Sequence, residues 1–370
     1  MTKLPFETYK LNQKLILKNR LVMAPMTTWS GNSDGTLSDE ELSYYAYRSR
    51  GVGLVITATT YVEPTGKGFS GQFYGGDDTM KSSLKQLADT IHSGGAKAIL
   101  QIFHAGRKSN PADMPEGVSL SASNVPGKRE QNNVPRAMTE DEIKNTIKSF
   151  KEATIRAYQA GFDGIEIHGA NTYLLQQYFS PHSNRRTDEW GGTLNNRVKF
   201  PLAVIDACME AKSHIDNPDF IIGYRFSPEE NSEPGITLED TDYLVDTLCE
   251  TELDYLHISL GHYEETSMRN PEVKDSTLKR VLDRIKGRKP FIGVGSVYSI
   301  NDAHKMLSYG VDLVAIGRQL LIDGKSIDKW EVDNETFKGY NPKRQLNEKI
   351  PKTLNEIIMS QKGWVPMDKS

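Results

Sequence analysis

The sequence predicts an α/β fold, a (β/α)8 TIM barrel, and two observations lead to this prediction. Eight short apolar runs recur along the 370 residues, and segments with helical periodicity lie between them. Strands that are apolar on both faces are typical of a parallel sheet that is covered by helices. The count of eight favours closure into a barrel. The alternative is an open, doubly wound sheet, but the chain has no early GxGxxG motif to support it.

The expected strands span residues 20–25, 53–61, 96–104, 163–169, 220–227, 254–260, 289–296 and 313–318. Helical patterns span residues 140–161, 238–250, 276–287 and 300–310. Thr139 and Glu142 form a capping-box pattern at the start of the first of these helices. The last two patterns end in glycine, which helix C-termini prefer.

Three further segments lie outside this alternation. Residues 6–19 precede the first strand and predict a β-hairpin that covers the bottom of the barrel. Residues 106–137 form a long insertion after the third strand, rich in Pro, Asn and Gly, which we expect to form a lid or wall over the C-terminal mouth. A charged tail follows the barrel, with a short helix expected near 353–361. We therefore expect one domain over 1–370, with a core of about 5–330 and a tail of about 331–370.

The composition is that of an ordinary soluble protein, with 37% apolar and 25% charged residues. A net charge of −4, with both signs mixed along the chain, predicts neither nucleic-acid binding nor a polybasic membrane anchor. The start of the chain lacks the apolar core of a signal peptide, and Cys208 and Cys249 have no metal-binding or disulfide pattern. These features predict a cytoplasmic protein. No HExxH motif is present, so we expect no metal site.

In barrels of this type the chemistry lies at the C-terminal strand ends, where the last two strands carry anion-binding residues. Gly295 and Ser296 follow strand seven, and Gly317 and Arg318 follow strand eight. Exposed backbone N–H groups beside a guanidinium predict a phosphate site. The alternative is a pair of tight turns with a surface arginine.

Two polar residues lie inside otherwise apolar strands. Arg225 needs an anionic or strongly accepting partner, which is either a ligand or Glu166 in an internal ion pair. Gln101 either satisfies a neighbouring backbone group or reads the edge of a flat heterocycle. A phosphate site, a buried cation and an amide together describe a mononucleotide lying across the mouth. A flavin fits well, because a fixed arginine stabilises the negative charge of the reduced ring.

The stretch DGIEIHGANTYL, residues 163–174, places three polar side chains at the end of the fourth strand. His168 and Asn171 can each donate a hydrogen bond to one substrate oxygen and stabilise negative charge that develops there. Tyr173 can donate a proton, because a phenol with an ordinary pKa of about 10 stays protonated at neutral pH. A histidine alone at this place is more often a satisfied core residue, but the three together favour a functional site.

Four stretches now reveal a resemblance to a known family: NRLVMAPMTT, QIFHAGR, GFDGIEIHGANTYLLQQYFSPHSNRRTDEWGGTLNNR and AIGR. Over about residues 5–330 the chain resembles the old yellow enzyme family of FMN-dependent ene reductases. SPHSNRRTDEWGGTLNNR is the most specific stretch, since general barrel physics does not demand it. The resemblance implies a TIM barrel with non-covalent FMN. NADPH or NADH reduces this flavin, and an α,β-unsaturated carbonyl compound, nitro compound or quinone reoxidises it.

The resemblance also implies roles for individual residues. Around the flavin it implies Thr27 near O4, Gln101 and Arg225 at the pyrimidine side, Pro25, Met26 and Ala58 against the ring, and Gly295, Gly317 and Arg318 at the phosphate. For the acceptor it implies His168 and Asn171 at the oxygen, Tyr173 as proton donor and Trp29 in the pocket wall. Some members end in Arg-Gly-Trp, which enters a neighbouring subunit. Lys362, Gly363 and Trp364 stand here, and we assign them no such role; homo-oligomerisation is left open.

The favoured hypothesis is an NAD(P)H:FMN ene reductase in which the nicotinamide and the acceptor bind alternately at one site. With two isolated cysteines and no iron–sulfur pattern, we expect electrons to arrive by direct hydride transfer from a diffusible nicotinamide. The alternative is a flavin-free barrel lyase or isomerase that uses His168 as base on a phosphorylated substrate. A flavin-binding sensor without turnover is a third hypothesis.

Overall fold

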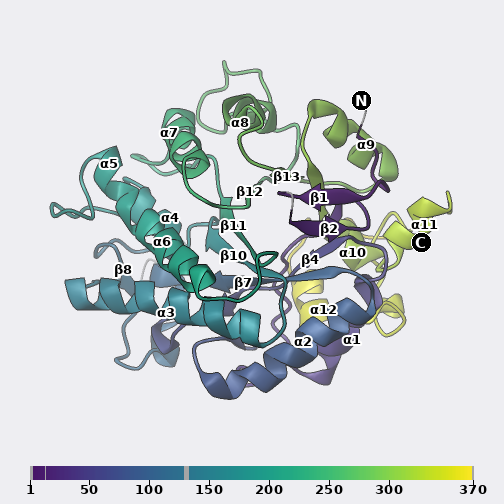
Figure 1. Cartoon of the computed structure of the whole chain (residues 1–370), viewed down its shortest axis with the longest axis horizontal. Coiled ribbons are helices and arrows are strands. Elements are labelled where there is room, and N and C mark those ends of the chain that lie inside the picture. Colours follow the sequence, from purple (N-terminus) through teal and green to yellow (C-terminus); the bar gives the residue numbers. More distant parts are fainter. Residues whose placement is uncertain (1–2, 13, 129–132, 369–370) are drawn as a thin grey trace.

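The computed structural model describes residues 3–12, 14–128 and 133–368, and it confirms the closed parallel barrel (Figure 1). The eight barrel strands are β3 (Leu21–Met23), β4 (Leu54–Ile56), β7 (Lys97–Phe103), β10 (Gly164–Gly169), β11 (Ile221–Phe226), β12 (Tyr255–Ile258), β13 (Phe291–Val294) and β14 (Leu313–Ile316). Each strand pairs in parallel with the next in this order, and β14 pairs with β3 to close the ring. The carboxyl ends of all eight strands therefore meet at one rim.

Helices surround the barrel. They are α1 (Asp39–Arg48), α2 (Lys81–Ser93), α3 (Glu140–Gln159), α4 (Leu174–Phe179), α5 (Leu194–Arg197), α6 (Lys199–Ser213), α7 (Leu238–Cys249), α8 (Thr277–Ile285), α9 (Ile300–Tyr309), α10 (Arg318–Ile322), α11 (Ser326–Glu331) and α12 (Lys352–Ser360). Short 3₁₀ turns lie at Pro64–Gly66, Asp78–Met80, Gly106–Lys108, Pro111–Asp113 and Pro342–Arg344. Helix α3 packs against α6 on the outside of the sheet (Figure 1).

The predicted helix ends are confirmed at two helices and shifted at a third. The capping box of α3 is present: the Thr139 N–H donates to the Glu142 carboxylate at 2.7 Å, and Thr139 Oγ1 accepts from the Glu142 N–H. Gly310 ends α9 in the left-handed conformation, with φ 114°. At α8, however, Lys286 takes the left-handed position with φ 51°, one residue before the predicted glycine.

The expected strand at 53–61 is wrong as a single element. Strand β4 ends at Ile56, and β5 (Thr60–Tyr61) pairs separately with β6 (Phe73–Tyr74) and with β7. The chain leaves the ladder between them because the Ala58 N–H donates to the hydroxyl of Tyr45 at 2.8 Å. A continuous apolar run therefore conceals a turn.

The N-terminal hairpin is confirmed. Strand β1 (Tyr9–Leu11) pairs antiparallel with β2 (Leu15–Leu17), and residue 13 in the predicted segment lies outside the described residues. Lys14 forms an ion pair of 2.6 Å with Asp254, which directly precedes β12. The hairpin thus lies at the amino ends of the strands, opposite the rim that carries the site.

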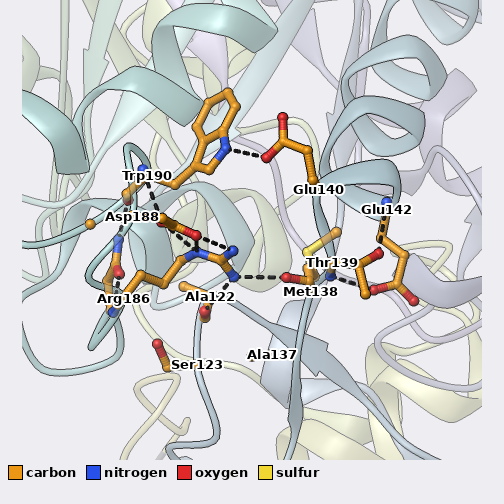
Figure 2. A network of polar contacts seen from close by, with 12 residues as sticks. Ala122, Ser123, Ala137, Met138, Thr139, Glu140, Glu142, Arg186, Asp188 and Trp190 are labelled. Carbon is orange, nitrogen blue, oxygen red and sulfur yellow. Dashed lines mark hydrogen bonds and ion pairs between the residues drawn. The ribbon is translucent and has the colours of Figure 1, made fainter.

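The insertion after β7 contains a short parallel pair, β8 (Leu120–Ser121) and β9 (Arg136–Ala137); residues 129–132 of the predicted segment lie outside the described part of the chain. Figure 2 shows how the most specific stretch of the sequence holds this insertion. The Arg186 guanidinium donates to the carbonyls of Met138 at 2.7 Å and Ala122 at 3.2 Å. Asp188 holds that guanidinium in place with a 2.6 Å ion pair. This stretch is therefore a clamp that holds the insertion at its β8 and β9 ends.

The C-terminal tail packs onto the barrel. Its predicted helix is α12, and Tyr340 pairs with Met367 in a short parallel bridge. Buried Arg48 donates to the Leu320 carbonyl at 3.0 Å and to the Glu348 carbonyl at 2.7 Å, which fixes the tail to α1 and α10. Within the described ranges, no helix has the length and apolar character needed to cross a membrane, and no cluster of His, Cys, Asp or Glu fits a metal ion.

The clamp at the insertion gives a testable prediction. Arg186→Met leaves two carbonyl groups without their charged donor, so we expect the free energy of unfolding to fall by about 2 kcal/mol. Limited proteolysis within 106–137 should become faster. Arg185→Met is the matched control, because Arg185 is exposed and, within the described part of the chain, its side chain donates a single hydrogen bond, from Nε–H to the His182 carbonyl. Equal effects of the two substitutions in urea denaturation would show that the clamp does not stabilise the insertion.

Candidate active site

A cavity of about 270 Å³ opens at the carboxyl ends of the strands. Most of the residues predicted to hold the cofactor line it: Pro25, Met26, Arg225, Gly295, Ser296, Gly317 and Arg318. The other predicted cofactor residues, Thr27, Ala58 and Gln101, do not line the cavity. The barrel therefore brings one part of the predicted set into a single cavity and places the remainder on neighbouring strand ends.

Hydrogen-bond donors gather at one end of the cavity. The Arg318 guanidinium donates to Ser296 Oγ and, at 2.8 Å, to the Gly261 carbonyl. Gly295 has φ 131°, and a Cβ there would lie 2.7 Å from the backbone of His262. Only glycine permits this close approach of two loops. A guanidinium beside a bare backbone loop is the donor set that a phosphate group requires.

Two buried polar atoms on the barrel strands, one of them on a cavity residue, have no hydrogen-bond partner among the described residues. Arg225 Nη2 donates to Ser259 Oγ at 3.1 Å, while Arg225 Nε has no hydrogen-bond partner among the described residues. The same holds for Gln101 Oε1. An unpaired buried polar atom costs free energy, so this place suits a ligand with both an acceptor and a donor. The pyrimidine ring of a flavin offers both, as carbonyl oxygens and the N3–H, and the donor set therefore fits FMN.

Arg225 and Glu166 do not form the direct ion pair that was one alternative from the sequence. Glu166 accepts hydrogen bonds from Gln101 Nε2 at 2.7 Å, from the Tyr255 hydroxyl at 3.1 Å and from His257 Nδ1 at 2.9 Å. Burial alone would raise the pKa of Glu166, but His257, Arg225 and Gln101 together hold that pKa below its ordinary value. The carboxylate acts on Arg225 through its charge.

Sequence reasoning missed Tyr255 and His257. Both lie on β12, and they alternate with apolar residues in YLHI. Successive side chains of a strand point to opposite faces, so this alternation places both polar groups on the inner face. This alternation of polar and apolar residues was the signal in the sequence that could have identified Tyr255 and His257.

The loop after β3 carries Thr27 and Trp29 and is pinned by a buried carboxyl group. Thr28 Oγ1 donates to Glu41 of α1. Burial raises the pKa of Glu41 to about 8, so this carboxyl group is mostly protonated at neutral pH. This hydrogen bond also restrains Thr27, which is half-buried and directly follows the cavity residue Met26.

His168 is a neutral hydrogen-bond donor. Its Nδ1 accepts from the Ala170 N–H at 3.1 Å, so the ring proton resides on Nε2. Burial, together with the charges of Arg225 and Lys108, holds the pKa of His168 well below its ordinary value. An imidazole whose one acceptor nitrogen is already occupied is poorly suited to act as a base, which weighs against the flavin-free hypothesis.

Asn171 is oriented by a relay that begins at Arg225. Arg225 donates to Ser259 Oγ, and Ser259 Oγ–H donates to Asn171 Oδ1 at 2.9 Å. Because its oxygen accepts from Ser259, Asn171 has its two N–H groups left to donate. Sequence reasoning missed Ser259, which directly follows β12 and carries no motif of its own.

Tyr173 lies beside His168 at the start of α4. The two ring centroids are 5.2 Å apart, and the Tyr173 ring packs edge-on against Phe103 at 4.4 Å. The Lys108 ammonium lies 4.4 Å from the centre of the Tyr173 ring and 3.3 Å from the Asn171 carbonyl oxygen. Lys108 thus places a positive charge over the face of the Tyr173 ring. The structure thus brings His168, Asn171 and Tyr173 together.

The C-terminal tail closes over the cavity of its own chain. Trp364 lines the cavity and packs edge-on against Trp29, with ring centroids 6.2 Å apart. The Trp364 carbonyl accepts from Arg318 Nη1 at 3.5 Å. Trp364 of the Lys-Gly-Trp sequence, to which we assigned no intersubunit role, therefore forms part of the cavity wall.

A closed parallel barrel with a phosphate-type donor set after its last two strands, and with a buried arginine and amide beside it, defines a flavin-mononucleotide oxidoreductase. The chain belongs to the NADH:flavin oxidoreductase / NADH oxidase family, whose model matches residues 6–335. This confirms the resemblance to the old yellow enzyme family and FMN as the cofactor. The match ends before α12, so Trp364 lies outside it.

Relatives and solved structures agree with this assignment. A probable NADH-dependent flavin oxidoreductase of Bacillus subtilis, YqiG, is 40% identical over 366 residues, which cover 98% of this chain and 97% of that protein. An NADH:acrylate oxidoreductase of Vibrio harveyi is 41% identical over 92% of this chain, but the match spans 34% of that protein. Morphinone reductase superposes with a TM-score of 0.79 at 27% identity over 91% of each chain. Its complex with tetrahydroNAD gives 0.77 at 26% identity, over 90% of this chain and 92% of that one.

The phosphate end of the cavity gives the second prediction. Arg318→Ala removes the charged donor, so we expect the dissociation constant of FMN to rise about ten- to hundred-fold. Riboflavin lacks the phosphate, and its affinity should change little. Quenching of flavin fluorescence measures both ligands. Arg284→Ala, at a surface arginine paired with Asp246, is the control. An equal loss for riboflavin would place Arg318 away from the phosphate.

Proposed function

We propose that this protein uses NADH or NADPH to reduce the activated C=C bond of α,β-unsaturated carbonyl compounds, and that quinones and nitro compounds are further acceptors. One observation carries the proposal: His168 and Asn171 are both set as donors beside the phenol of Tyr173. Arg225 connects this group to the FMN cavity, since it lines the cavity and pairs in register with His168 across β10 and β11.

FMN, when bound, would supply the redox chemistry, which is hydride transfer from the nicotinamide to the acceptor. The side chains supply the remaining chemistry. As the β-carbon of the acceptor is reduced, negative charge develops on its carbonyl oxygen, where the Nε2–H of His168 and the amide of Asn171 donate hydrogen bonds. Tyr173 then gives its proton to the α-carbon. Lys108 stabilises the phenolate that results.

The protonation states support this division of roles. His168 is held neutral by burial and by neighbouring cations, so it binds an oxygen without removing a proton. Arg225 lies next to the proposed pyrimidine side, where its charge favours the reduced cofactor. A barrel lyase that needs a basic histidine would require the opposite arrangement at His168, and it would leave the unpaired Gln101 Oε1 without a role.

NADH as reductant is supported by the names of the two curated relatives and by the complex of morphinone reductase with tetrahydroNAD. The acrylate activity belongs to a whole protein of which this chain covers 34%. An unsaturated acid is therefore one acceptor to test beside enones. A flavin sensor without turnover is less well supported, since it has no need of a proton donor.

Tyr173→Phe separates the two half-reactions. Removal of the proton donor should slow reoxidation of the reduced protein by 2-cyclohexenone about 10²-fold or more. Reduction by NADH should keep its rate, because it needs no proton from the phenol. Anaerobic stopped-flow absorbance follows both steps.

A quinone provides the internal control in the same variant, because its oxygens take up protons from water. Reoxidation by a quinone should therefore stay fast. Enone reoxidation at the wild-type rate would reject Tyr173 as the proton donor. Equal losses in all three reactions would indicate a disturbed fold.

A further inference from the structure

Glu166 lies at the centre of the barrel with no exposed surface and makes three hydrogen bonds. Its Oε1 accepts from Gln101, and its Oε2 accepts from Tyr255 and His257. Parallel pairing of β7 with β10 places Gln101 and Glu166 directly opposite each other. The Glu166 side chain thus links Gln101 of β7 to Tyr255 and His257 of β12.

An ionised carboxylate can accept hydrogen bonds but cannot donate one. Gln101 must therefore turn its NH₂ group toward Glu166, and its Oε1 must point the other way. That oxygen is the buried acceptor without a partner described above. The orientation of the Gln101 amide thus follows from the charge of its neighbour, because a glutamine in isolation offers a donor and an acceptor with equal ease.

We infer that Glu166 is a positioning residue that sets Gln101 to accept a hydrogen bond from the N3–H of the flavin pyrimidine ring. This inference rests on the proposed placement of FMN in the cavity. It assigns to Glu166 a part in cofactor recognition although Glu166 does not line the cavity. Glu166 then acts on the pyrimidine edge of FMN through Gln101 and not by direct contact.

The barrel interior is built to keep this carboxylate in place. Gly223 of β11 lies opposite Glu166, and a Cβ there would lie 2.0 Å from the Tyr255 ring. A larger residue would push Tyr255 away from Glu166. The His257 pKa is lowered chiefly by burial, and a neutral imidazole that donates its Nδ1–H still satisfies the second carboxylate oxygen. Both oxygens therefore have fixed donors.

Glu166→Gln should reverse the pattern. Tyr255 and His257 remain donors, so the new amide turns its oxygen toward them and its NH₂ group toward Gln101. Gln101 must then present its own NH₂ group to the flavin N3–H, which places donor against donor. We expect the dissociation constant of FMN to rise about ten-fold or more, as measured by quenching of flavin fluorescence.

The swapped double variant, Gln101→Glu with Glu166→Gln, keeps the net charge and should restore binding. Its carboxylate at position 101 accepts from the new amide with one oxygen and from the flavin N3–H with the other. FMN affinity within about three-fold of the wild type is expected. A purely structural role for Glu166 would not produce this rescue.

Glu230→Gln is the matched control. Glu230 is also a buried carboxylate that accepts from a glutamine, Gln176 Nε2 at 2.7 Å, but it does not line the cavity. Its substitution should lower stability and leave the FMN affinity unchanged.

Each outcome bears on a separate statement. Wild-type affinity in Glu166→Gln, or a double variant no better than that single variant, would overturn the role of Glu166. If Glu166→Gln alone does not fold, the swapped double variant decides: near-wild-type FMN affinity supports the inference, and weak binding contradicts it. A wild-type protein that binds no FMN would instead refute the proposed function.

Discussion

The buried guanidinium of Arg225 is the feature on which the rest of the site depends. A cation inside a barrel is costly unless acceptors surround it, and the chain provides Glu166 through its charge and Ser259 through a hydrogen bond. The same cation helps to keep His168 neutral. Through Ser259 it also orients the amide of Asn171. One buried charge therefore influences both His168 and Asn171.

A second consequence concerns the direction of hydrogen bonds. Glutamine and asparagine side chains carry a donor and an acceptor of similar shape, so a site that uses them must also fix their orientation. Here Glu166 fixes Gln101 and Ser259 fixes Asn171. The first amide is then left with its oxygen as an acceptor, and the second is left with its N–H groups as donors. In the proposed function, the first orientation serves the flavin and the second serves the carbonyl oxygen of the acceptor.

Sequence reasoning predicted the barrel because eight apolar strands and their helical connections are local patterns. It also predicted the strand-end residues, since parallel strands bring their carboxyl ends to one rim. It missed the break after Ile56, which depends on a hydrogen bond from Ala58 to the distant Tyr45. Tyr255 and His257 were overlooked although they alternate with apolar residues on β12. Ser259 was missed because its partners, Arg225 and Asn171, lie far from it along the chain. The fold of the tail over the cavity was not predicted, because no local pattern links Trp364 to Trp29.

The central claim is that the protein carries FMN, accepts hydride from a nicotinamide and passes it to an activated alkene. The most direct test is the visible absorption spectrum of the protein after reconstitution with FMN, recorded without oxygen. NADH is added first and 2-cyclohexenone second. Our account predicts a flavin band that bleaches with NADH and returns with the enone. A protein that takes up no flavin, or a band that neither NADH nor NADPH bleaches, would contradict it.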